Sequence, residues 1–272
     1  MTPPGGRPPR IASLVPSLTE TVFALGLGGR LVARTGFCIH PKEQVAGVAK
    51  VGGTKDVRLD RLRRLAPTHV LVNVDENRLE TIEAIRGWGD AAPEIVVTHP
   101  LGPDDNVGLV DLLASTFAGE AGVAGRAEEL RLALAAELAA TTAAERPERR
   151  VLYLIWHRPW MTVARDTYLS RMLATVGWRT LPAATGGFAG AARYPALGGD
   201  EAWLADVDEV LLSSEPFSFR AEHVALAQAM CPGARVRRVD GELLGWYGVR
   251  AVAGLRYLRA LADDNGAPAQ AR

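Results

Sequence analysis

Aromatic, histidine and acidic side chains gather in short runs that could bind a ligand or perform acid–base chemistry. The densest run is Trp156-His157-Arg158-Pro159-Trp160, and Glu215-Pro216-Phe217 and Trp246-Tyr247 follow later in the chain. Rings of this kind bind sizeable, partly apolar ligands, while charged neighbours fix the orientation of the ligand. The alternatives are that Trp156 or Trp160 packs in a core and that Glu215 caps a helix.

The first half of the chain carries two comparable runs. Phe37, Cys38 and His40 form one, and Asp75-Glu76-Asn77-Arg78 forms the other. Cys38 and His40 are weak metal-ligand candidates, since no third ligand is identifiable beside them. The alternative is a polar pocket wall or a loop hydrogen bond.

Motifs of common enzymes are missing from the sequence. There is no G-x-S-x-G or H-E-x-x-H motif, and the five histidines are scattered. Gly26, Gly28 and Gly29 close an expected helix instead of opening one, so they do not form a dinucleotide loop. Gly52-Gly53-Thr54-Lys55 lacks the spacing of a phosphate loop. We therefore assign no catalytic residue and expect no required cofactor.

Composition excludes further classes of function. The chain of 272 residues balances 31 basic against 31 acidic side chains, so nucleic acid is not an expected partner. Only two cysteines occur, without CxxC spacing, which gives no disulfide framework. No apolar run approaches the roughly 20 residues that span a bilayer. We expect a monomer that is not membrane-spanning.

The elements that position these runs alternate between strand and helix. Apolar strands separated by helices are typical of βαβ units, in which ligands lie at the carboxyl ends of parallel strands. Ser17 and Glu20 have the spacing of a capping box, which predicts a helix start there. The expected strands are 10–15, 31–35, 69–74, 94–98, 151–156, 210–213 and 236–239; the expected helices are near 43 and over 59–65, 77–87, 168–176, 220–230 and 252–262.

Residues 104–150 differ from the rest of the chain. Alanine, leucine, glutamate and arginine dominate there, and no strand-like run interrupts them. Residues 123–145 alone would give a helix of roughly 34 Å at about 1.5 Å per residue. The predicted fold class is α/β, with two Rossmann-like lobes whose mainly parallel central sheets are joined by one long helix.

The sequence resembles the helical-backbone periplasmic binding proteins for cobalamin and siderophores, also called helical backbone metal receptors. The resemblance covers about residues 10–261 and rests on several motifs besides the helical middle. They are 10–20 (RIASLVPSLTE), 51–55 (VGGTK) before 59–62 (LDRL), 156–163 (WHRPWMTV), 166–168 (DTY), 214–217 (SEPF), and 240–242 (DGE) with 246–248 (WYG).

The resemblance implies the domain order and a non-catalytic role. The segments would be a flexible leader (1–9), an N-terminal α/β lobe (10–118), a linking helix (119–148), a C-terminal α/β lobe (149–262) and a tail (263–272). The ligand, a corrinoid or another metal chelate, would lie in the cleft between the lobes and be delivered to an ABC importer. The candidate ligand-binding residues are Ser17, Phe37, His40, Thr54, Glu76, Asn77, Trp156, Arg158, Trp160, Tyr168, Glu215, Phe217, Trp246 and Tyr247.

The resemblance also implies a docking surface. Each lobe of such receptors presents an acidic residue to arginines of the permease, and Asp60 and Glu201 match by position. Asp60 stands where glutamate is usual. The alternative is that both are solvated carboxylates at helix starts.

Location and two competing functions complete the expectations. Residues 1–10 show neither the apolar core of a signal peptide nor a lipobox cysteine. A cytoplasmic location is therefore expected for the chain as written, and a periplasmic or surface-anchored one if a signal has been removed. The competing functions are an enzyme or maturation factor that uses His40, His157 or Glu215 for acid–base chemistry, and an intracellular sensor or chaperone.

Overall fold

The computed structural model describes residues 8–264, which divide into two compact units. Within these limits unit 1 contains residues up to Pro100, Asp105–Leu134 and Tyr247–Arg250. Unit 2 contains Leu101–Asp104, Ala135–Trp246 and the residues from Ala251 onward. The lobe boundaries predicted from sequence remain predictions. The predicted leader and tail lie mostly outside the described residues.

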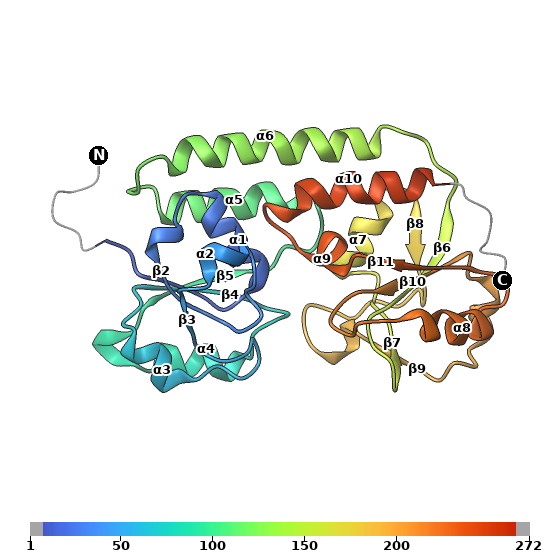
Figure 1. Ribbon diagram of the computed structural model, residues 1–272, viewed down its shortest axis with the longest axis horizontal. Coiled ribbons are helices and arrows are strands. Elements are labelled where there is room, and N and C mark those ends of the chain that lie inside the picture. The colour runs from blue at the N-terminus through green and yellow to red at the C-terminus, as the bar shows by residue number, and fades with distance from the viewer. Residues whose placement is uncertain (1–7, 265–272) are drawn as a thin grey trace. The chain divides into compact units, whose positions relative to one another are not determined.

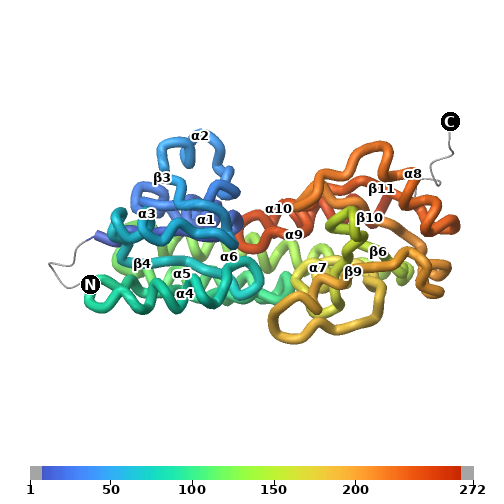
Figure 2. Tube along the Cα trace, turned by 90° about the horizontal axis from the view of Figure 1, so that it is seen from below, coloured from blue at the N-terminus to red at the C-terminus, as the bar shows by residue number. Residues whose placement is uncertain are grey.

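Unit 1 is built on a parallel five-stranded sheet with the order β3-β2-β1-β4-β5. Apolar residues fill its central strands, as expected where both faces of a sheet are covered. Its strands are β1 (Ile11–Ser13), β2 (Leu31–Arg34), β3 (Ala49–Lys50), β4 (His69–Asn73) and β5 (Glu94–Thr98). Figure 2 shows β3 and α2 (Lys42–Val45) at one edge of this unit and α4 (Leu79–Arg86) at the other.

Helices cover both faces of the sheet of unit 1. In Figure 1, α1 (Pro16–Ala24) and α5 (Asp105–Thr116) lie above the sheet, and α3 (Leu59–Arg64) and α4 lie below it. Leu62 of α3 and Ile82 and Ile85 of α4 join the strand residues Val70 and Val72 in one buried core. A short 3-10 turn precedes β2 (Gly28–Arg30) and another precedes β5 (Gly89–Ala91).

Unit 2 is built on a parallel four-stranded sheet with the order β11-β10-β6-β8. Its strands are β6 (Arg149–Leu154), β8 (Trp178–Thr180), β10 (Glu209–Ser213) and β11 (Arg235–Val239). A separate antiparallel pair is formed by β7 (Trp160–Met161) and β9 (Ala196–Leu197).

The two faces of this sheet are covered by different helices. Figure 1 shows α8 (Ala221–Met230) on one side and α10 (Arg250–Asp263) on the other. Leu152, Leu212 and Ala227 belong to the core between the sheet and α8. The remaining elements are α7 (Tyr168–Ala174), α9 (Gly241–Gly245) and two 3-10 turns (Ala191–Arg193 and Ala202–Asp206).

The long helix expected from the alanine-rich stretch is α6 (Val123–Thr142), whose 20 residues begin in unit 1 and end in unit 2. Val123, Ala127, Leu130 and Leu134 are buried at spacings of three or four residues, which gives the helix one covered stripe. The α/β class, the mainly parallel sheets and the long helix are confirmed.

One local prediction is wrong, and one alternative interpretation is excluded. The helix expected to be capped at Ser17 has Val15 at its N-cap and Pro16 at its first position, and Ser17 is buried inside its first turn. Proline fits that position because its missing N–H needs no partner there. Glu215 does not cap a helix, since α8 follows Arg220.

Candidate functional site

Six rings come together in unit 2 at the carboxyl ends of β6 and β10. The Trp156 and Phe217 ring centroids are 5.6 Å apart and those of Phe217 and Phe219 are 4.9 Å apart. Trp160 stacks on Phe219 with an interplanar angle of 9° and a centroid distance of 6.0 Å. We call the set the aromatic cluster: Trp156, His157, Trp160, Phe217, Phe219 and His223.

A hairpin holds the first part of the aromatic cluster in place. The Ile155 N–H donates to the Met161 carbonyl, and the Met161 N–H donates to the Trp156 carbonyl. Arg158 at the turn has a positive φ of 69°. The turn leaves Trp156 40 % exposed, which keeps much of its ring available to a ligand.

The two histidines of the aromatic cluster differ in their hydrogen bonds. His157 lies 4.3 Å from Trp160 and 5.0 Å from His223, measured between ring centroids. The Arg220 N–H donates to Nδ1 of His223 at 2.9 Å, which leaves the proton of a neutral His223 ring on Nε2. No hydrogen bond joins the ring of His157 to any other residue among 8–264.

The surroundings of His157 favour its neutral form. Burial, and then the charges of His223 and Arg158, lower the pKa of His157 below its ordinary value of 6.5. A neutral imidazole with a free nitrogen is a good ligand for iron or cobalt.

Glu215 and Trp246 form a tight contact beside the aromatic cluster. Trp246 Nε1 donates to Glu215 Oε1 at 2.5 Å, and the Ser213 hydroxyl donates to the Glu215 carbonyl at 2.6 Å. A Cβ at Gly241 would lie 2.3 Å from Ser213 Oγ, so the chain passes too closely there for a side chain. Trp246 is only 8 % exposed, so most of its ring packs inside the protein.

Tyr168 is also buried, in the first turn of α7, where Thr167 accepts a hydrogen bond from the Ser170 N–H. Arg158 is exposed and lies close enough to His157 to affect its charge. Tyr168 and Trp246 therefore stabilise the fold of unit 2, whereas Arg158 is free to meet a ligand.

Several predicted site residues of unit 1 also serve its internal structure. Asn77 Oδ1 accepts from the Asn73 N–H, and Asn77 Nδ2 donates to the Thr54 and Leu14 carbonyls. The buried Tyr247 hydroxyl donates to Glu76 Oε1 at 2.9 Å. Burial raises the pKa of Tyr247 well above 10, so its hydroxyl keeps its proton.

Phe37 is the exposed ring of unit 1. It is 63 % exposed on the loop after β2, and a Cβ at Gly53 would lie 3.3 Å from its ring. His40 and Thr54 are half-buried.

The structure gives no support to a metal site at Cys38 and His40. Cys38 is fully buried, with its thiol 3.1 Å from Thr35 Oγ1, and burial raises its pKa. Within residues 8–264 no group of three or more His, Cys, Asp or Glu side chains is arranged to hold a metal ion.

The structure of unit 2 likewise gives no support to the acid–base hypothesis, because His157 and Glu215 have separate partners. The Glu215 carboxylate bonds to Trp246, whereas His157 contacts the rings around it. No hydrogen bond between His157 and Glu215 exists in the described part of the chain.

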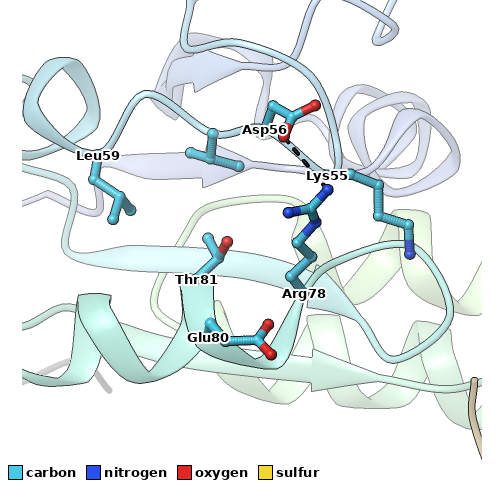
Figure 3. A pocket seen from close by; sticks show the side chains of 7 residues that line it. Lys55, Asp56, Leu59, Arg78, Glu80 and Thr81 are labelled. Carbon is cyan, nitrogen blue, oxygen red and sulfur yellow. Dashed lines mark ion pairs between the residues drawn. The ribbon is translucent and has the colours of Figure 1, made fainter.

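Unit 1 also contains an open hollow of about 710 Å³ between the start of α3 and α4. Figure 3 shows Arg78 reaching from the start of α4 toward Asp56, and the two groups are 3.6 Å apart. Lys55, Leu59, Glu80 and Thr81 also line it. The mixed charges of these groups fit a polar partner better than an apolar one.

The two residues predicted to dock a permease have different surroundings. Asp60 is exposed in the first turn of α3. Glu201 accepts hydrogen bonds from the Gly198 and Gly199 N–H groups at 2.7 and 2.9 Å. Burial alone would raise the pKa of the Glu201 carboxylate, but these backbone hydrogen bonds outweigh burial and lower it. The Glu201 carboxylate therefore stabilises the conformation of its own loop.

Sequence reasoning missed Phe219 and His223. Phe217 and Phe219 are two residues apart in the irregular segment between β10 and α8, and their ring centroids lie 4.9 Å apart. His223 is in the first turn of the next helix, close in sequence to both. The close spacing in the sequence was the available signal.

No family model matches the chain. It is 29 % identical over 177 residues to an uncharacterised ABC transporter substrate-binding lipoprotein of Bacillus subtilis, covering 62 % of this chain and 54 % of that one. It is 31 % identical over 80 residues to a vitamin B12-binding protein of Vibrio parahaemolyticus, covering 29 % of each. The matched stretches thus span about half or less of these relatives.

Solved structures match nearly the whole chain. The periplasmic vitamin B12-binding protein of Vibrio cholerae has a TM-score of 0.74 at 19 % identity, covering 94 % of this chain and 98 % of that one. A periplasmic heme-binding protein of Roseiflexus sp. RS-1 has a TM-score of 0.75 at 23 % identity, covering 95 % and 99 %.

These comparisons overturn the expected cytoplasmic location. The similar proteins are described as periplasmic or as a lipoprotein, which points to a location outside the cytoplasm. Among residues 8–264, no helix has the length and apolar character needed to cross a membrane. The chain has the two-lobe helical-backbone fold of ABC-importer substrate-binding proteins, and the resemblance inferred from its sequence motifs is confirmed.

Proposed function

We propose that the chain is the ligand-binding component of an ABC importer, and that its ligand is a planar metal chelate of the corrinoid or haem class. The observation that carries the proposal is the aromatic cluster, in which the rings of Trp160, Phe217 and His223 contact the imidazole of His157, whose pKa is lowered. The descriptions of three similar proteins name vitamin B12 or heme as the ligand, which supports the same class.

Ring contacts suit a large flat ligand. Each well-placed pair of aromatic rings contributes about 0.5–1.5 kcal/mol beyond the burial of its area. Trp156 and Phe217 meet edge to face at 64°, so a macrocycle lying on one ring would meet the edge of the other. We propose that these two rings supply the main apolar contact.

His157 and Arg158 would add specificity. A neutral His157 can coordinate iron or cobalt from one side of the chelate. The exposed Arg158 guanidinium can pair with a carboxylate of the ligand, as on a porphyrin, whereas the amides of a corrinoid offer it no charge. Loss of Arg158 should therefore weaken haem binding more than cobalamin binding.

The test is a titration of the purified apoprotein with haemin and with cyanocobalamin, followed by absorption. We expect saturable binding of at least one of them, and W156A should weaken it about tenfold, which corresponds to about 1.4 kcal/mol. H157A should remove the spectral shift of a coordinated metal while leaving weaker binding.

Phe188 supplies the matched control. It is an exposed ring of unit 2, at 72 %, and lies outside the aromatic cluster. F188A should therefore leave affinity within about twofold, or about 0.4 kcal/mol. Equal losses in W156A and F188A, or no binding of either chelate, would contradict the proposal.

A further inference from the structure

His223 is a buried histidine of unit 2 that carries an unused hydrogen-bond donor. It lies in the first turn of α8 and is only 7 % exposed. The Arg220 N–H donates to its Nδ1 at 2.9 Å, so the neutral ring carries its proton on Nε2. Among residues 8–264 no acceptor bonds to this Nε2–H, and the atom is not sealed from solvent. The ring therefore presents a donor that an acceptor from outside the chain can use.

The direction of this donor is fixed by the rings around it. The ring centroids of His157, Phe217 and Phe219 lie 5.0, 5.2 and 5.4 Å from that of His223, at interplanar angles of 82–88°. The ring does not turn over easily either, because a flipped ring would leave the Arg220 N–H without its acceptor. A donor that is already held in place loses little conformational freedom when it binds an acceptor.

The charges around His223 favour an acceptor that is negatively charged. After burial, the groups that lower the pKa of the adjacent His157 are His223 and Arg158, which are both cations when charged. No carboxylate among residues 8–264 raises the pKa of His157 in return. A hydrogen bond from the His223 N–H to a carboxylate would be about twice as strong as one to a neutral oxygen.

We propose that His223 is a specificity-determining residue, whose Nε2–H donates to a carboxylate of the ligand. The inference rests on the proposed function and narrows it, because such a donor selects metal chelates with an acidic rim over corrinoids, whose rim carries amides. Arg158 is exposed and long, so it can pair with a carboxylate in several positions, whereas His223 offers one fixed direction. The hydrogen bond from Arg220 to Nδ1 is a separate role, since it caps α8.

Two substitutions of His223 separate the donor from the helix cap. Glutamate and glutamine are the usual residues at this third helical position, where their side-chain oxygen accepts from the N-cap N–H. H223Q keeps both roles, because its acceptor oxygen and its N–H group are attached to one carbon, as Nδ1 and Nε2 are in the histidine ring. H223E keeps the acceptor for Arg220 but replaces the donor by a charged oxygen. Thermal unfolding near the wild-type temperature checks that both variants keep the fold.

The experiment titrates wild type and variants with haemin and with haemin dimethyl ester, in which both carboxylates are blocked. H223E should weaken haemin binding at least about tenfold, which corresponds to about 1.4 kcal/mol, whereas H223Q should stay within about threefold. For the dimethyl ester, H223E should stay within about threefold of wild type, because no carboxylate remains to be repelled. The matched variant A225E adds the same charge at an exposed position of α8 and should bind both compounds within about twofold of wild type.

Three results would overturn the proposal. If H223E weakens haemin and its dimethyl ester to the same extent, the contact does not involve a carboxylate. If A225E weakens haemin binding as much as H223E does, the loss is a general effect of charge. Equal losses in H223Q and H223E would show that the ring is required and its N–H is not.

The behaviour of wild type separates this inference from the proposed function. A protein that binds cyanocobalamin but not haemin retains the proposed function and contradicts the role of His223. A protein that binds neither chelate contradicts both. Binding of haemin that depends on the donor at His223 and on free carboxylates supports both.

Discussion

His157 makes the stability of the protein depend on pH. Its pKa is lowered in the folded state by burial, by His223 and by Arg158, whereas an unfolded histidine titrates near 6.5. The folded protein therefore binds fewer protons than the unfolded chain as pH falls below about 6.5. Stability is unaffected by His157 above that pH and falls as pH drops toward the folded pKa.

We expect H157Q to reduce the loss of stability between pH 7.5 and pH 5. Urea unfolding at both pH values gives the free energy of unfolding of wild type and variant, and carboxylates that titrate in this range affect both equally. The effect is small because His157 is half-exposed. Identical losses of stability in wild type and H157Q would show that the surroundings of His157 do not disfavour its charged form.

The residue types predicted which side chains would lie in loops. They did not predict which of these side chains would form contacts within the protein instead of remaining available to a ligand. Trp156, Trp160 and Phe217 were predicted as site residues and do lie together. Trp246 and Tyr247 have the same ring chemistry, yet each is buried with its polar atom donating to a glutamate. Burial depends on long-range packing, which neighbouring residues in the sequence do not reveal.

At the scale of elements, apolar runs and glycine positions predicted most strands and helices. The strands that were missed are short: β3 has two residues, and β7 and β9 pair through two residues each. Such lengths are too short for a period to be recognised. The strand β8 (Trp178–Thr180) was also missed, because it has only three residues and follows a helix closely.

Replacing a glycine inside a helix by alanine should change the free energy of unfolding in opposite directions at two positions. A Cβ at Gly254 in α10 would lie 2.1 Å from the Leu243 carbonyl oxygen, whereas one at Gly108 in α5 would meet nothing within 4 Å. G254A should therefore lower the free energy of unfolding by about 1–3 kcal/mol. G108A should raise it by about 0.5–1 kcal/mol, because alanine favours helix.

Thermal unfolding measures both variants. At about 2–4 °C per kcal/mol, G254A should melt lower than wild type and G108A slightly higher. A G254A protein that melts at or above the wild-type temperature would show that α10 can move away from Leu243 at little cost.

At the scale of the whole chain, α6 belongs to both compact units. Its residues up to Leu134 lie in unit 1 and those from Ala135 lie in unit 2, and its buried stripe includes Leu130 and Leu134. Unfolding of unit 1 would uncover this whole stripe, and a helix whose first half is exposed adds little stability to the rest. We therefore expect the two units to unfold in one transition.

The tryptophans allow this expectation to be tested from one unit only. Of the six tryptophans, Trp88 alone lies in unit 1, so a W88F protein reports by fluorescence on unit 2. Leu62 is fully buried in the core of unit 1, and L62A should cost about 2–5 kcal/mol. In the W88F background, L62A should shift the urea midpoint seen by the unit 2 tryptophans, and the exposed Leu79 provides L79A as the control. A midpoint that L62A leaves unchanged would mean that unit 2 folds without unit 1, and that the shared helix does not couple them.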